Sequence, residues 1–258
     1  MACKVMGIVN VTPDSFSDGG KYFTPAEAVR RAKNLVAEGA SFIDVGGEST
    51  RPGYSPLDWK EEWARIEEVV SEIASLGLKC AGGSDVVLSV DTYHPQTAEK
   101  ALAAGAGMIN CVYPAPVPEM VSLASAAKRE VSLVVPYECR ALPCFSREGA
   151  PFTYFDPMIG FGPSREDDIR LLGSIREMAG EVPVLVGASR KRVIKRLTGV
   201  KTPGKDIAGN LAVVVWAQLS GASVVRVHDV RESVQALRVI DILCGVKKDE
   251  GEENEIHV

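Results

Sequence analysis

Polar side chains stand at the ends of successive short apolar runs, and their types suit a site for a charged ligand. Seven runs carry such groups, which are Asn10, Asp44 with Glu48–Arg51, Asp91, Asn110, Asp156, Ser189–Lys191, and Arg226 with His228. A single Asp in this position is more often a helix cap or a loop anchor than a catalyst. Seven such ends favour one shared site over a series of separate caps.

The residue types in this set divide between two kinds of ligand group. Cationic side chains can hold an anion, and Arg offers phosphate oxygens a bidentate fork. Arg226 and His228 are two residues apart and share one face of a strand, which favours a site over a structural histidine. Carboxylate and amide groups suit the edge of a nitrogen heterocycle, and they are Asp91, Asn110 and Asp156. The pattern predicts a phosphorylated heterocyclic substrate.

The apolar runs alternate with amphipathic stretches, which is typical of βα units and a parallel sheet. Eight predicted strands end at Asn10, Gly47, Asp91, Asn110, Pro136, Pro157, Gly187 and Asp229. Helices are predicted at 25–38, 57–76, 95–104, 117–129, 166–179, 206–219 and 231–244. Eight parallel strands indicate an α/β fold, a closed (β/α)8 barrel, whose site lies where the strands end.

One βα unit departs from this pattern. The segment 137–151, YECRALPCFSREGAP, contains prolines and lacks the apolar period of a helix. The sequence therefore predicts a loop in place of the fifth helix. Barrel surface left uncovered there would need a partner subunit, a repacked loop, or a lower stability.

Composition limits the remaining possibilities. With 258 residues, 46% of them hydrophobic, the chain suits one barrel domain at 1–246, followed by a polar, mobile tail at 247–258. A net charge of -5 argues against general binding to nucleic acid or to an anionic membrane. Six scattered cysteines without CxxC pairs are interpreted as free thiols, and we expect a cytoplasmic protein without a signal peptide.

Several motifs occur in one order along nearly the whole chain. They are MGIVNVTPDSFSDGG at 6–20, IDVGGESTRPG at 43–53, SVDT at 89–92, IN at 109–110, DPMIGFG at 156–162, GASRK at 187–191 and VRVHDV at 225–230. Together they resemble the dihydropteroate synthase family. The resemblance implies a homodimeric transferase that joins 6-hydroxymethyl-7,8-dihydropterin diphosphate to p-aminobenzoate with the help of Mg²⁺, forming dihydropteroate and pyrophosphate.

The resemblance also implies a role for individual residues. Asn10 resembles the protein ligand of Mg²⁺. The residues expected to hold the diphosphate are Thr50, Arg51, Arg226 and His228. Those expected to line the pterin slot are Asp91, Asn110, Asp156 and Lys191. Catalytic roles are implied for Asp18, Phe16, Lys191 and Arg51, with Asp18 stabilising a pterin cation and Phe16 helping to enclose p-aminobenzoate.

Departures from the family pattern gather on the pterin side. Cys111 follows Asn110 where an Asp is common, and Tyr137 stands where a Met-His segment is usual and is expected to rebuild the floor under the pterin. Met158 replaces a usual glycine, and Arg192 stands where some members have serine. One alternative is therefore a pterin-binding homologue without catalysis or with altered specificity. A methyltransferase acting on a methylated tetrahydropterin is the other, although it would need no diphosphate anchor.

Overall fold

The computed structural model describes residues 3–12, 24–48, 55–162, 164–200, 202 and 204–245. The predicted tail at 247–258 lies outside the described residues. So do four residues of the predicted site, which are Phe16, Asp18, Thr50 and Arg51.

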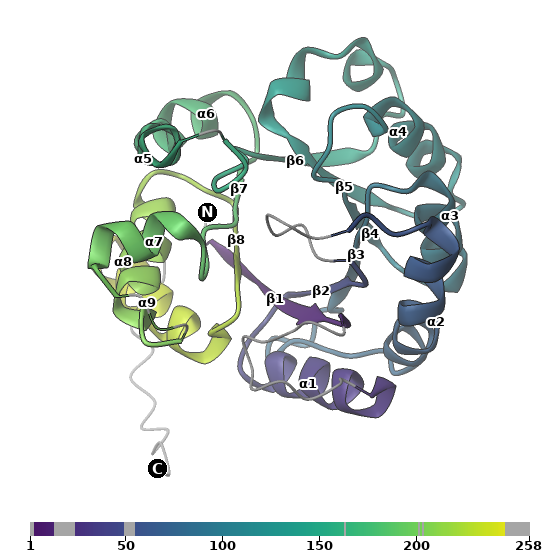
Figure 1. Ribbon diagram of the computed structural model, residues 1–258, viewed down its shortest axis with the longest axis horizontal. Coiled ribbons are helices and arrows are strands. Elements are labelled where there is room, and N and C mark those ends of the chain that lie inside the picture. Colours follow the sequence, from purple (N-terminus) through teal and green to yellow (C-terminus); the bar gives the residue numbers. More distant parts are fainter. Residues whose placement is uncertain are drawn as a thin grey trace.

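Eight parallel strands form one sheet that curls into a barrel (Figure 1). In chain order they are β1 (Lys4–Asn10), β2 (Phe42–Gly46), β3 (Val87–Asp91), β4 (Met108–Asn110), β5 (Ser132–Pro136), β6 (Phe152–Asp156), β7 (Leu185–Val186) and β8 (Val224–Val227). The sheet order runs from β6 through β1 to β8 and β7. Between β6 and β7 the barrel is joined by one bridge, in which Phe155 N donates to Pro183 O at 2.8 Å. The predicted (β/α)8 barrel is confirmed.

Helices surround the sheet on its outer side (Figure 1). They are α1 (Pro25–Ala37), α2 (Trp59–Ser75), α3 (Pro95–Ala104), α4 (Val117–Ala126), α5 (Arg165–Gly173), α6 (Ile175–Glu181), α7 (Arg192–Thr198), α8 (Ile207–Leu219) and α9 (Val230–Leu243). The single helix predicted at 166–179 is two helices, because the chain breaks at Ser174, the C-cap of α5. None of the helices in the described ranges has the length and apolar character needed to cross a membrane.

Helix ends follow local rules that the sequence already contains. Thr24 caps α1, and its side chain and that of Glu27 form a reciprocal capping box, with Pro25 in the first turn. Gly105 ends α3 with a φ of 118°, a conformation that a side chain would strain. These capping residues determine where α1 begins and where α3 ends, and so where the chain turns toward the next strand.

The barrel interior has an apolar layer below a polar one. The apolar layer is Met6, Phe42, Met108, Val134, Tyr154, Leu185 and Val224. Two residues further along four of these strands stand the polar residues Asp44, Asn110, Asp156 and Arg226. Because side chains on a strand alternate between faces, these four residues also face the barrel axis. The alternation therefore stacks the predicted site on an apolar base.

The predicted absence of a fifth helix is confirmed. All of residues 137–151 are described, and they form two short 3-10 turns, Tyr137–Ala141 and Pro143–Ser146, and no α-helix. Phe145 packs edge-on against Phe155 of β6, with ring centroids 5.4 Å apart. Of the three possibilities for covering this surface, the structure therefore shows a repacked loop.

The expected role of Tyr137 was wrong. Its hydroxyl donates to Glu181 Oε2 at 2.7 Å, and its ring stacks under Arg140, whose guanidinium carbon lies 4.1 Å from the ring centroid. Glu181 is the last residue of α6, in the outer layer of helices. Tyr137 therefore fastens the loop to this outer layer and does not form a floor for a ligand inside the barrel.

The packing of this loop predicts the effect of a mutation. We expect Phe145→Ala to lower the free energy of unfolding by about 2 kcal/mol, because it removes a half-buried ring and its contact with Phe155. Phe152 lies on β6 like Phe155, but it is 57% exposed. Phe152→Ala should therefore lower the free energy of unfolding by less than about 1 kcal/mol. Urea denaturation of both variants measures the difference. Equal losses of unfolding free energy in the two variants would show that the packing of Phe145 against β6 does not stabilise the barrel specifically.

Candidate active site

Strand register brings the predicted site residues to one end of the barrel. Asn10 pairs with Gly46, Gly46 with Asp91, and Asp91 with Asn110, so four neighbouring strands end at one level. Asp156 ends β6 and pairs with the last residue of β5. The carboxyl ends of these strands therefore form a single mouth, the place where barrel enzymes hold their ligands.

A buried ion network lies at the base of this mouth. Arg226 donates from Nε to Asp44 Oδ2 and from Nη2 to Asp91 Oδ2, both at 2.6 Å. Asp44, which is fully buried, also accepts hydrogen bonds from Ser89 at 2.6 Å and from Asn110 at 3.1 Å. The Asp44 carboxylate is thus surrounded by donors, as a buried charge requires.

The network shifts the pKa values of its members. Burial raises the pKa of Asp91 to about 7, although Arg226 acts to lower it and Asp44 to raise it. Burial acts to lower the pKa of Arg226, but the adjacent Asp44 and Asp91 carboxylates outweigh this effect and raise it. Arg226 therefore stays charged, and the Asp91 carboxyl group holds a proton more readily than an exposed carboxyl group does.

Two more buried ionisable groups, Asp156 and Lys191, lie on the β6 and β7 side. Asp156 is buried and accepts a hydrogen bond from Met158 N at 2.7 Å, and burial raises the pKa of its carboxyl group. Lys191 donates to Ile159 O at 2.6 Å, and burial lowers the pKa of its amine to about 8. A side chain at Gly187 would fill space beside both Asp156 and Arg226, so this glycine keeps the mouth open between them.

One acceptor in the mouth is left for a ligand. Asn110 donates its amide hydrogen to Asp44, but its Oδ1 is buried and has no hydrogen-bond partner within the described part of the chain. A buried acceptor without a donor costs about 1–3 kcal/mol. A ligand N–H directed at Asn110 would remove this cost, which fits the predicted role of Asn110 in the pterin slot.

His228 is the residue directly after β8, two positions beyond Arg226. Its Nδ1 is 3.0 Å from Ser189 Oγ, so the predicted segment Ser189–Lys191 meets it. Two nitrogens of Arg226 bind carboxylates, which among the described residues leaves Nη1 for a ligand. Joint binding of an anion by Arg226 and His228 stays a prediction. Thr50, Arg51, Phe16 and Asp18 lie outside the described residues, and their roles stay predictions.

Two of the sequence departures do not alter the lining of the mouth. Cys111 packs in the core between sheet and helices, because it follows Asn110 and faces the opposite side of the chain, and burial raises the pKa of its thiol to about 12. Arg192 Nε binds Asp168 Oδ2 at 2.8 Å, and Asp168 also accepts from Gly160 N at 2.7 Å. Arg192 thus anchors the segment that follows β6.

The sequence did not reveal every contributor to the site. The strand-end pattern alone assigns no role to Asp44, and its position two residues after Phe42 is the signal that could have placed it in the polar layer. Glu62 was missed altogether. It lies four residues before Ile66 on the buried face of α2, and an acid on a buried face is a signal of a specific partner.

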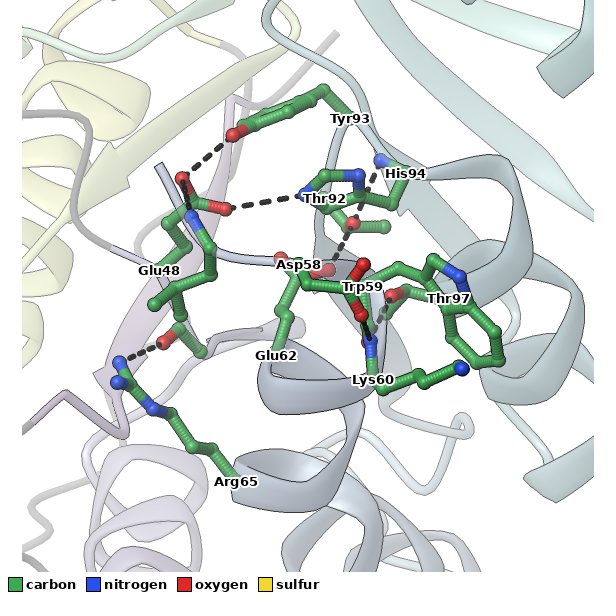
Figure 2. Close-up of polar contacts among 12 residues, drawn as sticks. Glu48, Asp58, Trp59, Lys60, Glu62, Arg65, Thr92, Tyr93, His94 and Thr97 are labelled. Carbon is green, nitrogen blue, oxygen red and sulfur yellow. Dashed lines mark hydrogen bonds and ion pairs between the residues drawn. The ribbon is translucent and has the colours of Figure 1, made fainter. Parts of the chain in front are cut away.

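That partner is Thr92, the residue after Asp91. Thr92 Oγ1 donates to Glu62 Oε2 at 2.6 Å and accepts from His94 N at 3.0 Å (Figure 2). Burial raises the pKa of Glu62 to about 7, the hydrogen bond from Thr92 acts to lower it, and the charges of Glu48 and Asp91 act to raise it. Glu62 therefore supports the turn that carries Asp91.

The raised pKa of Glu62 predicts a pH-dependent stability. Between pH 4.5 and about 7 the folded state holds this proton more tightly than the unfolded chain, so the contribution of Glu62 to stability falls as the pH rises. We expect the unfolding free energy of Glu62→Gln, relative to the wild type, to increase by about 3 kcal/mol from pH 5 to pH 8. Urea denaturation at both pH values measures this change. The same difference in unfolding free energy between variant and wild type at pH 5 and at pH 8 would contradict it.

The chain folds as a (β/α)8 barrel whose mouth carries buried charged and amide side chains. A family model described as pterin binding enzyme matches residues 6–139 and 152–228. The unmatched stretch between them, 140–151, lies within the loop that replaces the fifth helix.

Similar proteins extend this match to the whole chain. The dihydropteroate synthase of Staphylococcus haemolyticus is 37% identical over 273 residues, covering 98% of each protein. That of Escherichia coli K12 is 35% identical and covers 95% of this chain and 93% of its own. A structure of Xanthomonas albilineans dihydropteroate synthase with 4-aminobenzoic acid has a TM-score of 0.82, 36% identity, and coverage of 95% and 94%. The chain belongs to the dihydropteroate synthase family of pterin-binding enzymes.

Proposed function

We propose that this protein is a dihydropteroate synthase, a transferase of folate biosynthesis. It would condense 6-hydroxymethyl-7,8-dihydropterin diphosphate with p-aminobenzoate, giving 7,8-dihydropteroate and pyrophosphate. The observation that carries this proposal is the layer of carboxylate, amide and cationic side chains at the barrel mouth, in a chain that matches synthases over nearly its full length. A relative from Xanthomonas albilineans has been solved with 7,8-dihydropteroate.

The pterin would bind within the polar layer. Asp156 would accept hydrogen bonds from the guanidine-like edge of the ring, and Asn110 would offer its unpaired Oδ1 to a ring N–H. Lys191 and Asp91 would complete the slot, with Lys191 offering donors and Asp91 an acceptor. Because these groups sit on strand ends with a packed layer beneath them, they would hold the ring with little reorganisation.

The diphosphate would lie toward β8. Arg226 lies on that strand and His228 follows its last residue, and we propose that they hold the leaving pyrophosphate together with Thr50 and Arg51. In the reaction the bond between the pterin methylene carbon and the diphosphate oxygen breaks, and the electron pair leaves with pyrophosphate. The arylamine nitrogen of p-aminobenzoate then bonds to that carbon and loses one proton. Asp18 would stabilise the intervening pterin cation, and Phe16 would help to enclose the amine.

We propose a magnesium ion at the carboxyl end of β1. A Cβ at Gly46 would lie 3.9 Å from both Asn10 Oδ1 and Asp91 Oδ2, so the missing side chain leaves space beside two oxygen donors. In the described ranges no three or more His, Cys, Asp or Glu side chains form a metal cluster. Mg²⁺ is commonly held by one or two protein oxygens plus phosphate and water. We therefore propose Asn10 as its protein ligand, and the bound ion would offset the charge of the leaving pyrophosphate.

This assignment predicts a metal-dependent phenotype. Asn10→Ala should reduce the gain in pyrophosphate affinity that Mg²⁺ provides by about tenfold, since one oxygen ligand is lost. Pyrophosphate affinity without Mg²⁺ should change less than about twofold. Calorimetric titration with and without the metal measures both values. Asn34→Ala, at an exposed position of α1, is the control. A Mg²⁺ effect unchanged in Asn10→Ala would remove Asn10 from the metal site.

Pyrophosphate release tests the proposed activity. Purified protein is given dihydropterin diphosphate, p-aminobenzoate and Mg²⁺, with each substrate omitted in turn. Release that depends on p-aminobenzoate establishes a synthase. Pterin binding without release would favour a non-catalytic homologue instead.

Two broader features accompany this function. We propose a homodimer, because α8 leaves Trp216 and Leu219 each 45% exposed on its outer surface. We also propose a reducing, cytoplasmic setting, which is supported by six free thiols, all within the described residues. Sedimentation velocity and cell fractionation test these two features.

A further inference from the structure

A fully buried carboxylate on α5 holds the segment 158–162, which follows β6. The side chain of Asp168 is 0% exposed. Its Oδ1 accepts a hydrogen bond from Gly160 N at 2.7 Å, and its Oδ2 accepts one from Arg192 Nε at 2.8 Å. Arg192 Nη2 also donates to Gly162 O and, at 3.2 Å, to Ser164 O. Asp168 and Arg192 together therefore fix the backbone of this segment relative to α5.

The backbone of the segment 158–162 has a conformation that needs such support. Met158 has a φ of 63° and Gly160 a φ of 90°, so both lie in the left-handed region. This region is strained for a residue with a side chain, and it persists where the surrounding contacts impose it. Met158 N donates to Asp156 Oδ1 at 2.7 Å. Two carboxylates, Asp156 and Asp168, therefore hold the segment in this conformation.

The same segment determines the position of the Lys191 side chain. Lys191 Nζ donates to Ile159 O at 2.6 Å and lies 4.7 Å from the centroid of the Phe161 ring. A Cβ at Gly160 would lie 2.7 Å from Lys191 Cδ, so the lysine side chain lies directly against this backbone. An ammonium group has three donors, so it can bind Ile159 O and still donate to a ligand. A shift of the segment would therefore move the ammonium group of Lys191.

We propose that Asp168 is a positioning residue for the pterin slot. Through its hydrogen bond to Gly160 it holds the segment 158–162 against Lys191, and so it keeps the ammonium group in one position. Asp168 does not itself touch the pterin, and Arg192 assists by neutralising its buried charge. The proposal rests on the proposed function for the identity of the ligand.

Two variants of Asp168 separate the hydrogen bond from the ion pair. Asp168→Ala removes the acceptor for Gly160 N, and we expect the affinity for 6-hydroxymethylpterin to fall about tenfold. Pyrophosphate affinity in the presence of Mg²⁺ should stay within about twofold, because its proposed site lies toward β8. Asp168→Asn keeps an oxygen for Gly160 N, and the Arg192 side chain, 33% exposed, can turn toward solvent. Its pterin affinity should therefore stay within about threefold of the wild type.

A matched control lies on the same helix. Glu166 is 69% exposed and pairs with Arg196 at 3.0 Å, so Glu166→Ala removes an acid of α5 without removing the acceptor for Gly160 N. It should leave both affinities within about twofold of the wild type. Calorimetric titration with 6-hydroxymethylpterin and with inorganic pyrophosphate measures all three variants.

A double-variant cycle tests whether Asp168 acts through Lys191. Lys191→Met removes the ammonium group and should itself weaken pterin binding. Adding Asp168→Ala to it should lower pterin affinity by less than about twofold further, because the group that Asp168 positions is already absent. A further tenfold loss in the double variant would overturn the proposal. So would unchanged pterin affinity in Asp168→Ala or in Lys191→Met, or equal losses of pterin and pyrophosphate affinity in Asp168→Ala.

A second variant keeps the test decisive if Asp168→Ala does not fold. Asp168→Leu/Arg192→Met replaces the buried ion pair by apolar side chains, which commonly preserves stability, and it still removes the acceptor for Gly160 N. The same tenfold loss of pterin affinity is expected of it. Wild-type protein that binds 6-hydroxymethylpterin but releases no pyrophosphate refutes the synthase and leaves the test of Asp168 intact. Failure of the wild type to bind 6-hydroxymethylpterin would overturn both.

Discussion

Asp156→Asn should abolish tight pterin binding while leaving pyrophosphate binding nearly intact. The Asp156 carboxylate is buried, and its proposed task is to accept hydrogen bonds from the guanidine-like edge of the ring. The amide side chain of Asp156→Asn would direct its NH₂ group at one or more of these ligand donors, so a hydrogen bond would be lost. The substitution also removes the negative charge that acts on Lys191. Loss of charge-assisted hydrogen bonds at about 1.5–3 kcal/mol each predicts a decrease in pterin affinity of about 100-fold.

Direct titration with 6-hydroxymethylpterin and with pyrophosphate separates the two halves of the site. Asp85→Asn is a matched control, because its side chain is 76% exposed and it lies before β3, at the opposite end of the barrel. We expect pyrophosphate affinity in Asp156→Asn to stay within about threefold of the wild type. Equal losses of both ligands would mean that Asp156 supports the mouth as a whole and does not recognise the pterin.

Much of the site could be predicted because strand alternation and strand ends are local features. Asn10, Asp91 and Asn110 each close an apolar run, and the register of parallel neighbours then places them at one level. The absence of the fifth helix was equally local, since prolines and the lack of an apolar period identify a loop without any knowledge of the fold.

The ion pairs within the site could not be predicted from local sequence patterns. Arg226 and Asp44 are 182 positions apart, and their contact depends on how far the barrel staggers its strands, which no local pattern records. The predicted position of the Tyr137 side chain was wrong for a related reason. Its side chain is drawn outward by Glu181, a residue 44 positions away on a helix whose own start the sequence did not separate from α5.

Glu62 shows a further limit of sequence reasoning. An acid inside an amphipathic helix is usually assigned to the solvent side, and its burial here depends on Thr92, which approaches from the turn after β3. Such a residue becomes visible only when the partner is known. Its effect on Asp91 then passes through the neighbouring backbone and through charge, without direct contact with a ligand.

Replacement of Arg226 should have the largest effect on stability. Arg226→Met keeps much of the side-chain volume, but it leaves the Asp44 and Asp91 carboxylates without their shared cation. Removing one partner of a buried ion pair costs about 3–5 kcal/mol, because the remaining charge stays desolvated. Arg226 also acts to lower the pKa of Asp91, so its loss raises that pKa further above the unfolded value. The destabilisation should therefore grow as the pH rises from 6 to 8.

Urea denaturation at pH 6 and pH 8 measures this effect, and Arg30→Met, whose side chain is 70% exposed, serves as the control with less than about 0.5 kcal/mol expected. The double variant Asp44→Asn/Arg226→Met should regain part of the lost stability, because it removes one of the two unpaired charges and keeps an acceptor for Ser89. Additive losses in the double variant, or a destabilisation that does not change with pH, would show that Arg226 stabilises the barrel by packing and not by neutralising these two carboxylates.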